Sequence, residues 1–187
     1  AAIGEGGFLG LAVDPDFATN NFLYIYYTYH RDDGGIANKV SRFLLSNDKL
    51  TTEKTILYGI PASGNHNGGR IKFGPDGKLY ITTGDAENKE SAQNLDSLAG
   101  KILRINKDGS IPKDNPFQNS QIYSYGHRNP QGLAWDVKTN QMYASEHGQS
   151  ANDEINIIEK GKNYLWPNKQ CVNDEDPAVV CYSDFTL

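Results

Sequence analysis

The sequence repeats one pattern three times, and this repetition limits the folds open to the chain more than any other feature. Each copy has a strand of small and apolar residues, a turn rich in Asp, Gly or Pro, and a second strand that carries Tyr. The copies span residues 10–28, 69–85 and 132–148, so their opening glycines lie 59 and 63 residues apart. A period of this size predicts propeller blades or another array of small sheets.

The segments between the copies are also typical of strands. Side chains alternate within the copies, as from Lys78 to Thr82, which is the pattern of a strand between two different environments. Further strands are expected over residues 40–45, 56–60, 100–105 and 154–158, whereas the best helix candidate, 90–98, has few apolar positions. Each period therefore holds about four short strands, the content of one propeller blade.

The three periods predict an all-β fold, with residues 1–187 forming one partial β-propeller domain whose blade repeats start near residues 10, 69 and 132. Propellers typically close with about 4–8 blades, and three periods use the whole chain. The ring would be completed by further blades of a longer protein or by a second copy, as in a homodimer. The way in which the sequence starts and stops within the pattern favours the longer protein.

Composition excludes some classes of partner. The chain has 18 Lys and Arg against 23 Asp and Glu, a formal net charge of −5, and no basic block. Nucleic acids and anionic membranes are therefore poor candidates. No apolar run reaches the roughly 18 residues of a membrane-spanning helix. The first residues also lack the basic and apolar regions of a secretory signal, which is either absent or already removed.

The two cysteines, Cys171 and Cys181, have nine residues between them, including Pro177. They could form a disulfide that closes a loop in an oxidising compartment, or remain two separate thiols. Without a Cys-x-x-Cys motif or paired histidines they do not indicate a zinc site.

Polar side chains and glycines gather in four short segments, each at the end of an expected strand. These segments are residues 4–7 (GEGG), 64–70 (GNHNGGR), 126–132 (GHRNPQG) and 146–154 (EHGQSANDE). Because they occupy matching phases of the repeat, we expect them to converge on one site.

The chemistry of these segments allows two interpretations each. His66 could accept a proton from a substrate hydroxyl near pH 7, or be a surface histidine in a turn. Arg128, held with Asn129 before Pro130, could stabilise negative charge on a carbonyl oxygen or tie neighbouring blades together. The oxygen-rich segment 146–164 could bind calcium, or form a solvated acidic loop.

Five ordered motifs carry a resemblance to a known family. They are GEGGFLGLAVDPDF, GNHNGGRIKFGPDGKLYITTGD, LAGKILRINKDGS, IYSYGHRNPQGLAWD and SEHGQSANDEINIIEKGKNYLWP. In order and spacing they resemble the soluble, PQQ-dependent glucose/sorbosone dehydrogenase family, and within it the aldose sugar dehydrogenases. The resemblance implies roughly the middle half of a six-bladed propeller. It also implies oxidation of the C1 hydroxyl of aldose sugars to lactones by hydride transfer to pyrroloquinoline quinone (PQQ), with calcium.

Site residues follow from the same motifs. The resemblance implies that His66 is the general base and that Arg128 lies beside the quinone oxygen. It places Asn65, Asn129 and His147 at the cofactor, and Glu5 and Asn129 at the substrate. Asn65 stands where some members have Asp, and the substitution removes a charge that could have oriented the imidazole. Glu5 stands where Gln is common, which leaves the substrate preference open.

The resemblance also implies two calcium sites. Gly148 and Gln149 would hold the active-site ion by their main-chain carbonyls, and Glu154 and Tyr164 would contribute to a structural ion. The cationic residues that clamp the carboxylates of PQQ in this family come from later blades, so the chain alone is expected to bind PQQ weakly. The family implies a periplasmic or extracellular location.

Two other functions remain compatible with the same scaffold. One is a binding module that has lost catalysis, similar to the hedgehog-interacting proteins, although such a module would not need His66 and Arg128 at these phases. The other is a calcium-dependent lactonase or hydrolase, which would need several carboxylates around the channel. The carboxylates here cluster in one segment, which disfavours a hydrolase.

Overall fold

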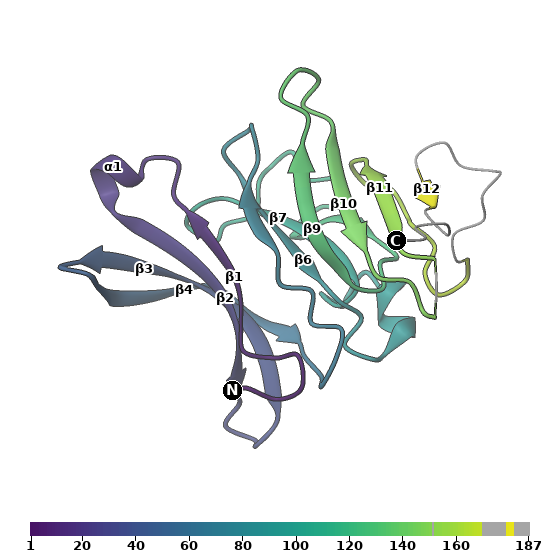
Figure 1. Cartoon of the computed structure of the whole chain (residues 1–187), viewed down its shortest axis with the longest axis horizontal. Helices are drawn as coiled ribbons and strands as arrows, with labels where there is room; N and C mark the ends of the chain where they lie inside the picture. The colour runs from purple at the N-terminus through teal and green to yellow at the C-terminus, as the bar shows by residue number, and fades with distance from the viewer. Residues whose placement is uncertain (151, 170–178, 182–187) are drawn as a thin grey trace, which may run out of the picture.

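The computed structural model describes residues 1–150, 152–169 and 179–181 (Figure 1). Its strands form three antiparallel sheets of four strands, each in sequence order. The first sheet contains β1 (Phe8–Val13), β2 (Phe22–His30), β3 (Ile36–Ser46) and β4 (Lys49–Pro61). The second contains β5 (Ile71–Phe73), β6 (Leu79–Thr83), β7 (Lys101–Ile105) and β8 (Ile122–Tyr125). The third contains β9 (Pro130–Trp135), β10 (Met142–Glu146), β11 (Glu154–Ile158) and β12 (Val179–Cys181).

The all-β prediction is confirmed, and the strands expected between the repeats are present. Residues 40–45 lie in β3, 56–60 in β4, and 154–158 coincide with β11, while the strand expected at 100–105 begins one residue later as β7. The helix candidate 90–98 is wrong: only a 3₁₀ turn, η1 (Lys89–Ala92), forms there, because sparse apolar positions give a longer helix no face to bury.

A four-residue helix, α1 (Phe17–Asn20), forms in the turn of the first repeat, where none was expected. Cys171 and the side chain of Cys181 fall outside the described residues, so their disulfide stays a prediction.

Alternating side chains place the second sheet between the other two. Leu79 and Ile81 of β6 belong to a buried cluster with residues of the first sheet, such as Tyr24 and Tyr26. Tyr80, between them, belongs to a second cluster shared with β9, β10 and β11. Full burial of one such side chain contributes about 1.5–3 kcal/mol, so two such clusters fix the order of the sheets.

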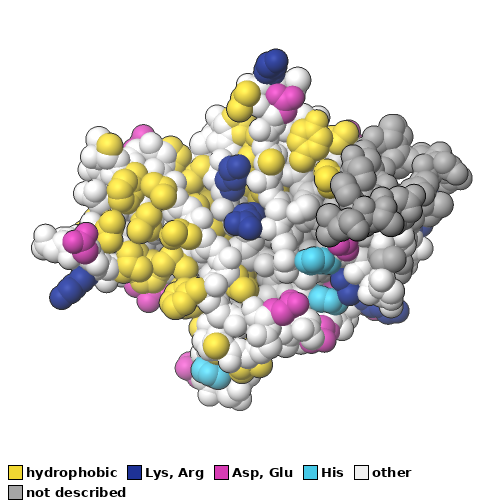
Figure 2. Space-filling view, viewed as in Figure 1, with side chains coloured by type: hydrophobic (Ala, Val, Ile, Leu, Met, Phe, Trp, Pro, Cys, Tyr) yellow, Lys and Arg dark blue, Asp and Glu magenta, His cyan; other side chains and the backbone are white. Residues whose placement is uncertain are grey.

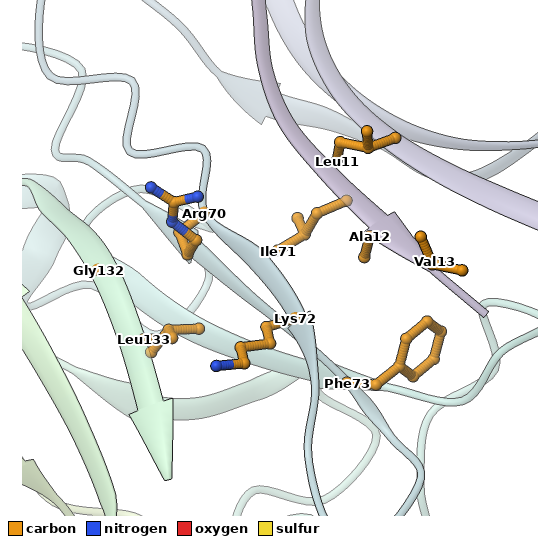
Figure 3. A pocket seen from close by; sticks show the side chains of 9 residues that line it. All are labelled: Leu11, Ala12, Val13, Arg70, Ile71, Lys72, Phe73, Gly132 and Leu133. Carbon is orange, nitrogen blue, oxygen red and sulfur yellow. The ribbon is translucent and has the colours of Figure 1, made fainter. Parts of the chain in front are cut away.

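The first strands of the three sheets, β1, β5 and β9, are edge strands that border one hollow of about 580 Å³ (Figure 3). Along β5, Ile71 and Phe73 point toward β1, whereas Lys72 points toward β9. The hollow is lined by Leu11, Ala12, Val13, Arg70, Ile71, Lys72, Phe73, Gly132 and Leu133. Sheets that turn their first strands toward a common hollow are arranged as propeller blades are around a channel.

Apolar side chains remain exposed on the first sheet, and Figure 2 shows them gathered over β1 and its neighbours. Phe8 is 81% exposed, Leu11 60% and Val13 52%. A contiguous apolar face of this kind is typical of a surface that another part of an assembly covers. In the described part of the chain, no helix has the length and apolar character needed to cross a membrane.

Candidate functional site

The fold itself brings the polar segments of the sequence together. β5 and β9 run in the same direction, since Gly68 N–H donates to Asn129 Oδ1 at 3.0 Å and Arg70 Nε donates to the carbonyl of Gln131 at 3.0 Å. The loops that enter these strands therefore lie at one end of the hollow. β6 and β10 are antiparallel to them, so these strands finish at the same end. Residues 64–70, 84–87, 126–130 and 146–149 thus form one site.

His66 lies in the first of these segments and has a partly accessible ring. Its side chain is 20% exposed, and Nδ1 lies 2.8 Å from Oδ1 of Asp85, which is 2% exposed. A carboxylate oxygen accepts a hydrogen bond from the ring, so the facing nitrogen is Nδ1–H and Nε2 carries the lone pair. The imidazole is therefore held in the tautomer that can take a proton at Nε2.

Asp85 is the functional residue that the sequence analysis missed. The sequence predicts that Asn65 removes a charge that could orient the imidazole, and the structure corrects this point because Asp85 supplies such a charge. The repeat contained the signal: Asp85 closes the second copy at the phase where Gly148 closes the third. The other oxygen of Asp85 accepts the indole N–H of Trp166 at 2.9 Å.

The backbone around His66 is shaped to aim its ring. His66 itself has a φ of 57°, in the left-handed region that histidine, like Asn and Asp, adopts more often than other residues with a side chain. Its carbonyl lies so close to Gly84 that a Cβ there would stand 2.0 Å from the oxygen. Glycine at position 84 therefore permits the contact between the His66 loop and the end of β6.

Asn65 and Glu5 hold the main chain of this loop. Asn65 donates through Nδ2 to Oε1 of Glu87 at 3.1 Å, and Glu5 accepts the main-chain N–H of His66 at 3.0 Å. Hydrogen bonds from Ser63 and Asn65 hold the pKa of Glu87 below its ordinary value. The structure thus places both predicted site residues beside His66, with part of their polar groups already engaged within the protein.

Arg128 is fixed by a buried network below it. Its main-chain N–H donates to Oε1 of Glu146, whose Oε2 lies 2.9 Å from Nδ1 of His127. His127 is fully buried and its Nε2 accepts from Ser124 Oγ at 2.8 Å, while its ring stacks on Tyr164. The network sets the position of the Arg128 backbone, whose carbonyl in turn accepts the N–H of Asp85 at 2.8 Å.

The guanidinium of Arg128 connects two other parts of the site. It donates from a terminal nitrogen to the carbonyl of His147 at 3.1 Å and lies 5.5 Å from the ring centroid of Trp166. Nε of Arg128 is buried and has no acceptor among the described residues. Because a buried N–H of a cation is costly to leave unpaired, this atom can accommodate an anionic or carbonyl oxygen of a ligand.

The predicted metal-binding residues meet at one small hollow. Gly148, Gln149, Glu154 and Tyr164 all line it, beside Arg128. The residues of the two predicted calcium sites therefore line the same hollow. Side-chain oxygens alone do not form a site: among the described residues, no group of three or more His, Cys, Asp or Glu is placed to hold a metal ion. A cation here would depend on main-chain carbonyls.

His147 and Asn129 lie on the two sides of the same end of the sheet. The N–H of His147 donates to the carbonyl of Asn129 at 3.3 Å, while its ring, 55% exposed, lies 3.7 Å from Asp153. Asn129 is buried, and its Oδ1 is turned toward Gly68. Asn129 therefore joins the His66 loop to the Arg128 loop, and the ring of His147 lies outside this junction.

Comparisons with known proteins match both the sequence and the fold. Residues 1–178 match the model of the family described as Glucose / Sorbosone dehydrogenase. The chain is 42% identical over 175 residues to aldose sugar dehydrogenase YliI of Escherichia coli, covering 89% of this chain and 47% of that protein. It is 39% identical over 214 residues to quinoprotein glucose dehydrogenase B of Acinetobacter calcoaceticus, covering 99% of this chain and 44% of that protein.

Among solved structures, the PQQ-bound form of the aldose sugar dehydrogenase from Streptomyces coelicolor is similar with a TM-score of 0.85 and 44% identity. The match covers 91% of this chain and 51% of that one. The chain therefore spans about half the length of the relatives that it matches.

Proposed function

Because the chain belongs to the glucose/sorbosone dehydrogenase family, we propose that the protein oxidises the C1 hydroxyl of an aldose sugar to a lactone with PQQ and calcium. The observation that carries this proposal is the contact between His66 and Asp85 beside Arg128. Oxidation of a carbinol requires a base that takes the proton of its hydroxyl group and a cation that stabilises the acceptor of the hydride from its carbon, and the two adjoining loops supply both. The names of the similar proteins, an aldose sugar dehydrogenase and a quinoprotein glucose dehydrogenase, support the substrate and cofactor class.

His66 performs the proton step in this proposal. Its Nε2 accepts the proton of the C1 hydroxyl, and the Asp85 carboxylate stabilises the imidazolium that forms. Loss of that proton drives the C1 hydrogen to leave as a hydride, and the carbon becomes the lactone carbonyl. A positioned base of this kind contributes about 10²–10⁴-fold to the rate. The loop geometry keeps the ring partly exposed, which gives a sugar hydroxyl access to Nε2.

Arg128 fits the anionic cofactor. Its buried Nε, which has no acceptor in the described part of the chain, can donate to a ligand oxygen, and the charge of the guanidinium stabilises negative charge that develops there. When bound, PQQ supplies the two-electron acceptor, and calcium polarises the quinone carbonyl. The carbonyls of Gly148 and Gln149 would hold that ion, while Glu154 and Tyr164 would hold the structural ion. Asn65, Asn129 and His147 would border the cofactor, with Glu5 and Asn129 toward the sugar.

The location of the protein follows from the same cofactor. We propose a periplasmic or extracellular protein, where PQQ enzymes of this type act.

The experiment uses the protein at its full natural length. It is loaded with PQQ and calcium and mixed with a panel of aldoses and a dye acceptor. We expect dye reduction that His66→Ala abolishes and that Asp85→Asn lowers by about 10²-fold or more. His30→Ala, at an exposed position at the end of β2, is the matched control and should keep wild-type activity. Failure of the loaded wild-type protein to oxidise any aldose would refute the proposal.

A further inference from the structure

Trp166 reaches the site from a distant part of the chain. It follows β11, yet its main-chain N–H donates to the carbonyl of Gly126 at 3.0 Å, and its own carbonyl accepts from Gln93 Nε2 at 2.6 Å. The side chain is only 8% exposed. These two main-chain hydrogen bonds thus hold Trp166 against loops that follow strands of the second sheet.

The indole N–H completes the hydrogen bonding of Asp85. It donates to Oδ2 at 2.9 Å, while Oδ1 accepts from the ring of His66 and from the main-chain N–H of Glu87. Each oxygen of this buried carboxylate therefore has a donor. Fixing Oδ2 fixes the plane of the carboxylate, and the plane determines where Oδ1 meets the imidazole.

The face of the same indole contacts the guanidinium of Arg128. The Arg128 guanidinium lies 5.5 Å from the ring centroid, within the range of a cation–π interaction. Tryptophan combines an edge donor with a wide aromatic face, whereas phenylalanine offers only the face. One side chain thus contacts both the partner of the base and the cation.

We propose that Trp166 is a positioning residue that sets the base and the cation of this site relative to each other. Its N–H orients His66 through Asp85, and its ring face orients Arg128. The assignment rests on the proposed function for its catalytic consequence, while the orientation itself can be measured without any substrate.

The first test is the tautomer of His66 in the full-length protein, measured by nitrogen NMR on labelled histidine. The chain has four histidines, and His66→Ala identifies the signal. We expect Trp166→Phe to reduce the Nδ1–H signature of His66, because Oδ2 of Asp85 loses its donor. Trp166→Leu should also remove the ring-current shift of the Arg128 Nε–H signal. Trp135→Phe, at the other tryptophan, is the control and should change neither signal.

The second test is kinetic. We expect Trp166→Phe to lower kcat about tenfold with KM changed by less than about twofold, because orientation of the base is lost and substrate contacts are kept. In an Asp85→Asn background the same substitution should have no further effect, since its route to His66 is already cut.

Two results would overturn the assignment. One is a folded Trp166→Phe protein whose His66 signal matches the wild type, together with a folded Trp166→Leu protein whose Arg128 signal does so. The other is a full additional loss of kcat in the double variant. Absence of sugar oxidation in the wild type would count against the proposed function alone, because the NMR result still decides the role of Trp166.

Discussion

Removal of the Glu146 carboxylate tests the idea that a buried network holds the Arg128 loop. In Glu146→Ala, the Nδ1–H of His127 and the main-chain N–H of Arg128 both lose their acceptor. A buried donor left without a partner costs about 1–3 kcal/mol, so we expect the free energy of unfolding to fall by about 4 kcal/mol. Glu146→Gln should cost only about 1–2 kcal/mol, because the amide oxygen can serve Arg128 while His127 changes tautomer to accept from the amide nitrogen.

Urea unfolding followed by tryptophan fluorescence measures both values. With a denaturant slope of about 2 kcal/mol per molar, the midpoint of Glu146→Ala should fall by about 2 M at an unchanged slope. Glu90→Ala removes an exposed glutamate from η1 and should stay within about 0.5 kcal/mol of the wild type. If Glu146→Ala were as stable as Glu90→Ala, the network would not hold this loop.

Three further predictions concern the surroundings of the site and the fold. Gly84→Ala should lower dye reduction by about 10²-fold, because the new Cβ displaces the His66 carbonyl; intact dye reduction would contradict this. Hydrogen bonds from Tyr27 and Ser41 lower the pKa of Glu53 from 4.5 to about 2, so the stability that this carboxylate contributes is present above pH 4.5 and is lost as the pH falls through 2. The free energy of unfolding should fall by about 1 kcal/mol over this pH range after solvent screening, and unfolding of Glu53→Gln measured against pH should not show this decrease. Lys101→Met should cost about 2–3 kcal/mol in urea unfolding, since three main-chain carbonyls lose the buried ammonium as donor.

The fold was largely predictable because the repeat is a local property of the chain. The period of about 60 residues and the alternation within strands depend on which face each side chain presents, and both are visible in the sequence. The prediction was wrong for the two short helices, whose formation depends little on the local sequence pattern. α1 has no side-chain cap on Asp16, and η1 stops after one turn, so neither helix has a strong sequence signal.

The candidate site was predictable in its loops and not in its contacts. The phase of the repeat indicated that His66 and Arg128 converge, and the structure brings their loops together. The pairing of His66 with Asp85 depends on how closely the end of β6 approaches the loop at Gly84, which is a tertiary distance. No spacing in one sequence specifies such a distance, so the pairing of Asp85 with His66 could not be predicted from the repeat.

The repeat makes the loops of the three blades alike, whereas the proposed reaction needs loops that differ. Glu146 and Trp166 contribute to this difference. Repetition of one blade delivers three equivalent loops to one end of the hollow, but equivalent loops would give a symmetric site. A reaction that needs a base on one side and a cation on the other requires residues that join unlike blades. Glu146 joins β10 to His127, which follows β8 of the second sheet, and Trp166 joins the segment after β11 to the end of β6. We therefore expect substitutions at these joining residues to alter the chemistry of the site more than substitutions in the turns that each blade repeats.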